Sequence, residues 1–368
     1  MFQNVGQSGI LYRIGKAGIE MQTILEDMRS GISEEGIRLG GEILKQGGLV
    51  AFPTETVYGL GGNALDAEAS AKIYAAKGRP SDNPLIVHIA DFSDLEKIVE
   101  EVPEEAKKLA DAFWPGPLTM IMRKNEKVPY GTTGGLETVA VRMPNHDTAL
   151  KMIRAGGGFI AAPSANTSGR PSPTMASHVA EDMNGKIDMI LDGGSVGIGL
   201  ESTIIDLSEE IPTILRPGFI TQQMLADVIG RVEIDAALID NNSKVHPKAP
   251  GMKYRHYAPK ANMILIRGEK EKVAQKIRQL VEEELKEGRN PGILCAEETA
   301  HLYPEGMIKK IGTLREELTI SRHLYGALRE FDEEKVSSIF SETFETPVLG
   351  TAIMNRLMKA AGHQLIEV

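Results

Sequence analysis

Four basic side chains stand at the ends of predicted strands and helices: Lys77, Arg79, Arg142 and Arg216. In an α/β sheet, ligands bind at strand ends, and cations placed there are best explained by an anion of several charges. A nucleotide triphosphate is the commonest such anion. The histidines are scattered and no carboxylate pair stands out, so acid–base hydrolysis has little support. The sequence therefore predicts a nucleotide site that works by charge neutralisation and positioning.

Polar or glycine-rich segments accompany these cations. The sequence PTETVYGLG at 53–61 runs from a strand end into a turn where the backbone can approach a ligand closely. Residues 163–172, PSANTSGRPS, are dense in hydroxyl and amide groups and follow an apolar strand. GLEST at 199–203 precedes LRPG at 215–218. These segments supply hydrogen-bond donors and acceptors close to the cations in the sequence.

Each segment also has a purely structural interpretation. A lysine near a helix C-terminus complements the helix dipole, so Lys77 followed by Gly78 and Pro80 would be an ordinary helix end. The Asn, Ser and Gly residues of 163–172 suit a turn equally well. Arg216, next to a proline, would then be a solvated loop residue. The combination of all the segments is what favours a binding site.

Several common catalytic motifs are missing. The Gly-Lys pairs at 15–16 and 185–186 are not followed by Ser or Thr, so neither is a P-loop. Gly193, Ser195 and Gly197 match the nucleophile elbow of hydrolases, but a strand-like segment follows where that motif requires a helix. No His-Glu-x-x-His pair exists, which excludes a zincin.

The composition is that of a globular protein of two ordinary domains, with 368 residues of which 42% are hydrophobic and 25% charged. The formal net charge of −10 argues against a protein that coats nucleic acid by bulk electrostatics. The single cysteine, Cys295, excludes an internal disulfide and cysteine-rich metal sites. No apolar run approaches the roughly 20 residues of a membrane span, and no secretory signal is recognisable. We expect a cytoplasmic protein.

Hydrophobic periodicity predicts a mixed α/β sheet, followed by a smaller Rossmann-like α/β domain. One helix is expected from the N-cap Ser33 to Gly47, a second from Asp66 to Gly78, and a loop over 58–63. The predicted strands are 49–52, 85–89, 118–123, 139–143, 159–162, 189–191, 202–206, 263–266, 292–295, 307–311 and 337–340. Further helices are predicted at 104–113, 148–156 and 174–183.

The hydrophobic periodicity that predicts helices and strands ends after residue 221, where a segment rich in Asp, Asn and Pro follows. The predicted organisation is an N-terminal extension with a first strand (1–32), a catalytic domain (33–222), a linker (223–262) and a C-terminal domain (263–368). Aromatic and cationic residues in the linker, among them Arg255 and Tyr257, favour a lid over a plain tether.

The chain also resembles the YrdC-like threonylcarbamoyl-adenylate synthases. The motifs that carry the resemblance are, in order, PTETVYGLG at 53–61, KGRP and NP within 77–84, LIVHI at 85–89, WPGPLT at 114–119, VAVRMP at 139–144, Ser164-x-Asn166 and ESTIID at 201–206. APGMKYRHYAP at 249–259 resembles the linker of the long, two-domain form. Together these motifs are very specific, and the resemblance covers nearly all of the chain except residues 1–20.

The resemblance implies roles for individual residues. ATP contacts are implied for Lys77, Arg79, Asn83, Thr138, Ser164, Asn166, Ser172, Arg216, Arg255 and Tyr257, with Lys77 and Arg79 as catalytic residues. The threonine side is implied for Thr56, His88, Arg142, Ala162 and Ser202. No protein side chain is assigned as a metal ligand, and Mg²⁺ is expected to enter with ATP.

The implied reaction condenses L-threonine, bicarbonate and ATP to threonylcarbamoyl-AMP and pyrophosphate, for threonylcarbamoyladenosine modification of tRNA. A hand-off to the tRNA threonylcarbamoyl-transfer machinery is implied, with weak or no direct nucleic-acid binding. One alternative is an RNA-binding module for tRNA or double-stranded RNA without adenylation activity, which the acidic charge disfavours. A second is a carbamoyl-transfer enzyme that uses carbamoyl phosphate, whose expected zinc fingers one cysteine cannot supply.

Overall fold

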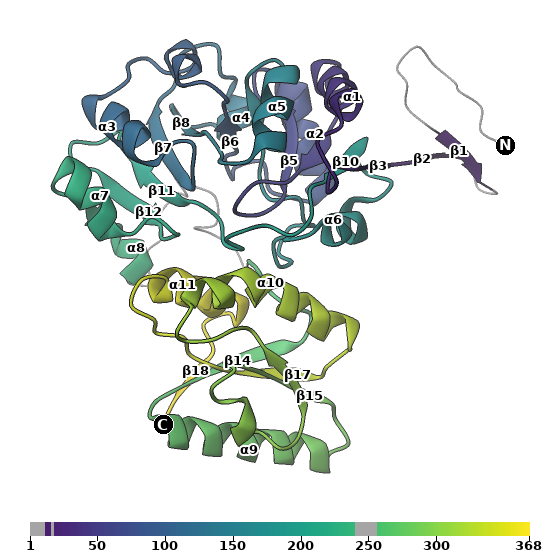
Figure 1. Cartoon of the computed structure of the whole chain (residues 1–368), viewed down its shortest axis with the longest axis vertical. Coiled ribbons are helices and arrows are strands. Elements are labelled where there is room, and N and C mark those ends of the chain that lie inside the picture. Colours follow the sequence, from purple (N-terminus) through teal and green to yellow (C-terminus); the bar gives the residue numbers. More distant parts are fainter. Residues whose placement is uncertain (1–11, 16–17, 240–255) are drawn as a thin grey trace. The chain divides into compact units, whose positions relative to one another are not determined.

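The computed structural model describes residues 12–15, 18–239 and 256–368 of the chain. They divide into two compact units. The first unit comprises the described parts of Met1–Ser168, Pro173–Gly197 and Glu201–Lys253, and the second those of Gly169–Ser172, Ile198–Leu200 and Tyr254–Val368. Figure 1 shows helices and strands in both units. Two short loop segments, Gly169–Ser172 and Ile198–Leu200, thus belong to the second unit although the chain on either side of them belongs to the first.

The first unit is built on an 11-stranded sheet with parallel and antiparallel pairs, which confirms the predicted mixed sheet. In sheet order its strands are β13 (Glu233–Ile234), β12 (Thr213–Arg216), β11 (Thr203–Asp206), β7 (Leu118–Arg123), β8 (Thr138–Arg142), β6 (Ile86–His88), β9 (Ile160–Ala161), β5 (Gly59–Asn63), β4 (Val50–Phe52), β10 (Met189–Asp192) and β3 (Ile24–Asp27). A separate antiparallel pair, β1 (Tyr12–Gly15) and β2 (Gly18–Met21), precedes them.

The first two helices of the first unit begin and end at the capping residues that the sequence predicts. Ser33 caps α1 by accepting from the Gly36 amide at 3.0 Å, and Asp66 caps α2 by accepting from the Glu68 amide at 2.9 Å. Gly78 ends α2 in the left-handed conformation, at φ 62°, which glycine adopts without strain. The α-helices are α1 (Glu34–Lys45), α2 (Ala67–Lys77), α3 (Glu104–Phe113), α4 (Tyr130–Thr133), α5 (Asp147–Ala155), α6 (Ala176–Met183), α7 (Gln222–Ile229) and α8 (Ala236–Ile239), with a 3₁₀ turn η1 (Phe92–Lys97).

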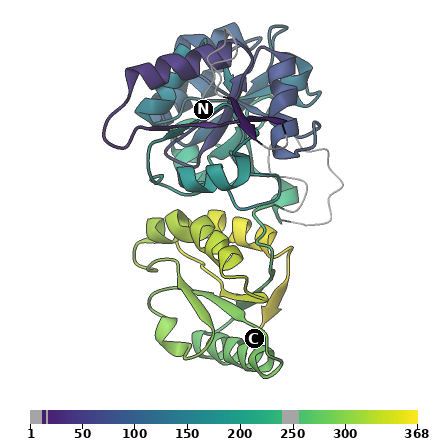
Figure 2. The same ribbon diagram turned by 90° about the vertical axis from the view of Figure 1, so that its right-hand side faces the viewer.

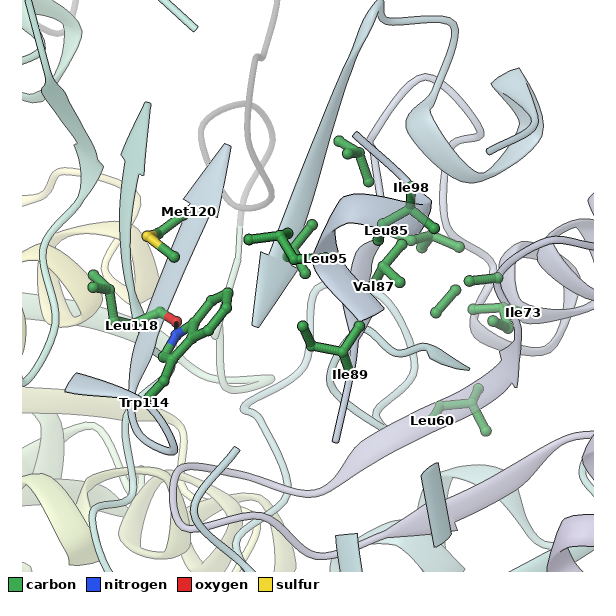
Figure 3. Close-up of a cluster of buried hydrophobic side chains, with 14 of the residues drawn as sticks. Leu60, Ile73, Leu85, Val87, Ile89, Leu95, Ile98, Trp114, Leu118 and Met120 are labelled. Atoms are coloured by element: carbon green, nitrogen blue, oxygen red, sulfur yellow. Dashed lines mark hydrogen bonds between the residues drawn. The ribbon is translucent and has the colours of Figure 1, made fainter. Parts of the chain in front are cut away.

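The core of the first unit is a cluster of buried aliphatic side chains around the central strands, part of which Figure 3 shows. Trp114, which follows α3, is 8% exposed and joins this cluster. Its indole Nε1 donates to the Leu118 carbonyl at 2.7 Å, so the polar atom of the ring is satisfied inside the core. This bond ties the end of α3 to the start of β7.

The second unit is a parallel sheet with helices on both faces, as Figures 1 and 2 show, in agreement with the predicted Rossmann-like domain. Its strands, in sheet order, are β16 (Met307–Lys310), β15 (Pro291–Cys295), β17 (Ser338–Glu342), β14 (Asn262–Arg267) and β18 (Leu365–Glu367). The helices are α9 (Lys270–Lys286) on one face and α10 (Glu317–Glu333) and α11 (Gly350–Ala360) on the other, with a 3₁₀ turn η2 (Ala300–Leu302).

Three segments differ from expectation. The predicted loop at 58–63 is wrong, because β5 pairs with both β4 and β9 there. Residues 213–216 form the strand β12, whereas the Pro-Gly pair after Arg216 suggests a loop there. The predicted linker, 223–262, begins inside α7, and β13 within it adds a strand to the sheet of the first unit.

Candidate active site

The register of the central strands gathers several candidate side chains at one end of the sheet. Because β6 and β8 are parallel, their last residues His88 and Arg142 lie opposite each other. β7 runs antiparallel to β8 and parallel to β11, so the starts of β7 and β11 reach the same end. β12 is antiparallel to β11 and brings Arg216 there, next to Ser202. The sheet therefore assembles residues that lie more than 100 positions apart in the sequence.

Arg142 is the centre of this group, and its side chain is only 5% exposed. Nη1 donates to Thr56 Oγ1 at 2.9 Å, and Nε donates to the Gly116 carbonyl at 3.3 Å. Nη2 lies 2.7 Å from Oε1 of Glu55, whose side chain is 13% exposed. Thr56 Oγ1 in turn shares a 2.9 Å hydrogen bond with Thr54 Oγ1. The guanidinium group is thus fixed in a nearly dry setting.

A second buried chain of polar contacts joins Ser202 to Arg216. Arg216 Nε donates to the Ser202 carbonyl at 3.0 Å, and Nη2 donates to Ser202 Oγ at 3.1 Å. Ser202 Oγ shares a further hydrogen bond of 2.8 Å with Thr119 Oγ1. Arg216 is 4% exposed, so its interpretation as a solvated loop residue is wrong.

His88 and Ala162 lie on neighbouring backbones. The Ala162 amide donates to the Ile86 carbonyl at 2.9 Å, which places Ala162 beside β6. The His88 ring is 3% exposed and lies 3.2 Å, through Nδ1, from the same carbonyl. Burial, together with the charge of Arg142, lowers the pKa of His88 to about 3. The ring is therefore neutral near pH 7 and can offer a hydrogen bond without adding charge.

Lys77, the last residue of α2, is 2% exposed. Its Nζ donates to the Asn166 carbonyl at 2.6 Å and also to the Ser164 carbonyl. Both acceptors lie outside α2, so the amino group holds residues 164–166 as well as standing at a helix end. Ser164 Oγ donates to Asn166 Oδ1 at 2.6 Å, which orders the same segment.

Arg79 and Asn83 form a neighbouring group. Arg79 Nη2 donates to the Pro84 carbonyl at 2.9 Å, and its Nε donates to the Asn83 carbonyl at 3.2 Å. Asn83 is 2% exposed, and its Oδ1 has no hydrogen-bond partner within the described part of the chain. The side-chain amide is thereby left with an open acceptor.

Thr138 is a candidate that the structure separates from the strand-end group. Thr138 opens β8 and Arg142 ends it, so these two residues lie at opposite ends of the strand. Ser172 and Tyr257 belong to the second unit, where the Tyr257 ring stacks on Tyr325 with centroids 5.3 Å apart. Arg255 lies outside the described residues.

Sequence reasoning missed three polar residues of this region. Glu55 contacts Arg142 and Thr119 contacts Ser202, and each lies inside a motif that carries the family resemblance. His146, at the start of α5, has a buried Nδ1 without a hydrogen-bond partner among the described residues. The position of Glu55 between two buried threonines was the available signal, because a carboxylate in such a setting needs a partner.

A cavity of about 770 Å³ reaches Lys77 from the side of α1 and α2. Its lining is mainly apolar, with a few polar side chains: Ile43, Gln46, Gly48, Leu49, Lys72, Ala75, Ala76, Lys77, Gly78, Thr167, Lys186 and Asp188. Arg142 and Ser202 are not part of this lining. The cavity is therefore distinct from the strand-end group.

Two searches of the described residues bear on metals and membranes. Within residues 12–15, 18–239 and 256–368, no three His, Cys, Asp or Glu side chains gather as a metal site would require. Among the helices of the same ranges, none has the length and apolar character needed to cross a membrane.

Comparison with known proteins gives a consistent result along most of the chain. A family model described as "Telomere recombination" matches residues 42–218, and one described as "Threonylcarbamoyl-AMP synthase, C-terminal domain" matches residues 220–362. The threonylcarbamoyl-AMP synthase of Pyrococcus abyssi is 50% identical over 346 residues, which cover 94% of this chain and all of the relative. That of Bacillus subtilis is 51% identical over 326 residues, 88% of this chain and 92% of the relative.

A solved structure agrees with the sequence matches. The crystal structure of Pyrococcus abyssi Sua5 complexed with L-threonine has a TM-score of 0.89 and 49% identity, and the match covers 94% of this chain and the whole of that one. The predicted resemblance is confirmed, and the chain belongs to the threonylcarbamoyl-AMP synthase family.

Proposed function

We propose that this protein is an L-threonylcarbamoyladenylate synthase that condenses L-threonine, bicarbonate and ATP to threonylcarbamoyl-AMP and pyrophosphate. The observation that carries the proposal is the match over 94% of this chain to a relative of that name, whose structure has been solved with L-threonine. The buried cations of the first unit are consistent with it, because two of the three substrates are anions and the third carries a carboxylate.

The proposed binding residues fall into two sets. For ATP we propose Lys77, Arg79, Asn83, Thr138, Ser164, Asn166, Ser172, Arg216, Arg255 and Tyr257. For threonine we propose Thr56, His88, Arg142, Ala162 and Ser202. The contacts of Arg142 with Thr56 and of Lys77 with the Ser164 and Asn166 carbonyls support the two assignments at the level of single side chains.

The chemistry needs little from an acidic or basic side chain. The amine of threonine gives up a proton and adds to carbon dioxide, or to bicarbonate with release of water, to form a carbamate. The anionic oxygen of the carbamate then attacks the α-phosphate while pyrophosphate leaves. Lys77 and Arg79 would stabilise the charge that develops on the leaving group, and the other residues would hold the reactants in line. A magnesium ion, entering with ATP, would neutralise phosphate charge.

The product is a labile mixed anhydride, so we expect it to pass to a tRNA threonylcarbamoyl-transfer machinery. A cytoplasmic location would suit that hand-off. We further propose that residues 223–262 act as a linker and lid, between a catalytic domain of 33–222 and a C-terminal domain of 263–368.

The test is pyrophosphate release with each substrate omitted in turn. We expect release to require threonine, bicarbonate and ATP together. Serine should be a modestly poorer substrate, because one missing methyl group changes binding by only about 1–3 kcal/mol. Full-rate ATP cleavage without threonine would contradict the proposal and indicate an unrelated ATPase.

A further inference from the structure

The Arg142–Glu55 pair is close but not hydrogen-bonded. Nη2 and Oε1 are 2.7 Å apart, yet neither atom makes a directed hydrogen bond. The second carboxylate oxygen, Oε2, also has no hydrogen-bond partner among the described residues. The two charges therefore compensate each other, while Nη2 of Arg142 can still donate a hydrogen bond and the carboxylate of Glu55 can still accept one. Buried polar groups in this state are costly and call for an explanation.

Arg142 cannot easily turn to improve the geometry of this contact. Its Nε and Nη1 are held by the Gly116 carbonyl and by Thr56 Oγ1. Thr56 is itself fixed by the hydrogen bond to Thr54, which also donates to the Val57 carbonyl at 2.7 Å. The guanidinium plane is thus set by the backbone and the threonines, and its Nη2 edge stays available.

The neighbouring histidine, His146, adds no charge beside Glu55. Burial lowers the pKa of His146, although Glu55 and Asp147 act in the opposite direction, so the ring is neutral near pH 7. A neutral ring does not compete with a cationic ligand for the carboxylate.

We propose that Glu55 is a further binding residue of the amino-acid site, which makes the Arg142–Glu55 pair a receptor for both charged groups of the zwitterion. The ligand's carboxylate accepts from Arg142 Nη2, and its ammonium group donates to the carboxylate of Glu55. The two protein charges that compensate each other in the free site are then each matched by an opposite charge of the ligand. The identity of the amino acid as threonine rests on the proposed function, whereas the requirement for both charged groups rests on this pair.

The test compares two ligands on one substitution, Glu55→Gln. L-Threonine carries the ammonium group, and 2,3-dihydroxybutanoate keeps the carboxylate but has a hydroxyl in its place. Calorimetric titration of the full chain should show that Glu55→Gln weakens threonine binding by about 10- to 100-fold, as expected for a lost hydrogen bond to a charged group. Binding of the hydroxy acid should change by less than about threefold.

The matched control is Glu35→Gln, because Glu35 is an exposed carboxylate 2.6 Å from Arg38 on α1. It should leave both affinities unchanged. The melting temperature and circular dichroism of each variant check folding. If Glu55→Gln does not fold, Glu55→Asp keeps the charge at a shorter reach and should weaken threonine binding more than hydroxy-acid binding.

Equal losses for both ligands would overturn the proposal, because Glu55 would then only position Arg142. No loss for threonine would overturn it as well. Wild-type protein that binds no α-amino acid contradicts the receptor itself. Wild-type protein that binds threonine, with the expected Glu55 dependence, but releases no pyrophosphate contradicts the proposed reaction and leaves the receptor standing.

Discussion

Two buried cations of the first unit have different partners. Lys77 donates to the neutral carbonyl oxygens of Ser164 and Asn166, whereas Arg142 faces the carboxylate of Glu55. Carbonyl oxygens orient a cation without cancelling its charge, and a carboxylate cancels it. The carbonyl contacts of Lys77 fix the direction of its amino group, whereas the carboxylate beside Arg142 suits a ligand without net charge such as an amino acid. The difference indicates how one sheet can present two kinds of site.

The largest expected effect is the loss of pyrophosphate release when Lys77 is replaced. We expect Lys77→Met to reduce pyrophosphate release by about 100-fold or more, because a charge contact to the transition state typically contributes this much. Lys72→Met is the matched control, since Lys72 lies on the same helix and its exposed side chain donates to the Gly47 carbonyl at 2.7 Å. Near-normal turnover of Lys77→Met would show that Lys77 only ends its helix.

At position 142, we expect threonine binding to depend on the shape of the side chain as well as on its charge. Arg142→Lys keeps the positive charge but loses the guanidinium fork, so we expect the KM for threonine to rise by about 10- to 100-fold. ATP affinity should stay within about threefold. Arg154→Lys, at an exposed arginine 3.1 Å from Asp91, is the control. A parallel loss of ATP affinity would mean that the two sites are not separate.

The contact between Ser202 and Arg216 should contribute less. Ser202→Ala removes the hydroxyl that meets Thr119 and Arg216, and we expect a loss of about five- to tenfold in kcat/KM. Ser208→Ala is the control, because that serine bonds to Asp206 at the opposite end of β11. If both variants lose activity equally, the effect is one of strand stability.

A further effect concerns the pH dependence of stability and leaves turnover aside. The pKa of His88 is about 3 in the folded protein and about 6.5 in the unfolded chain, so the unfolded chain binds the extra proton as the pH falls below 6.5. The free energy of unfolding should therefore be highest above pH 6.5 and fall toward pH 3. Between pH 7.5 and 5.5 we expect it to fall by about 1.4 kcal/mol. Urea unfolding, followed by circular dichroism at both pH values, measures it.

His88→Asn should remove that part of the pH dependence. His301→Asn, at an exposed histidine of the second unit, should retain it. An unchanged pH dependence in His88→Asn would show that His88 titrates normally in the folded protein.

The sequence predicted best what local signals determine. The caps at Ser33 and Asp66 and the helix end at Gly78 are short-range features, and each is present. The placement of Lys77, Arg142 and the 163–172 segment at element ends was also predictable, because apolar runs stop there.

What the sequence could not give depends on pairing between distant residues. The strand β5 is an example, because its Gly-rich sequence lacks the β-branched residues that are typical of a strand. Its glycines are needed for close packing, since a Cβ on Gly61 would lie 2.7 Å from the Phe52 ring. The contact of Glu55 with Arg142 links residues 87 positions apart, and only the sheet register creates it.

The core position of Trp114 gives the molecule an internal optical reporter. It is the single tryptophan of the chain, and it lies in the first unit with its indole bonded to Leu118. Indole emission therefore follows the loosening of that unit alone, whereas circular dichroism follows the helices and strands of both. Comparing the two signals during denaturation would show whether the two units unfold together or in sequence, without any added dye.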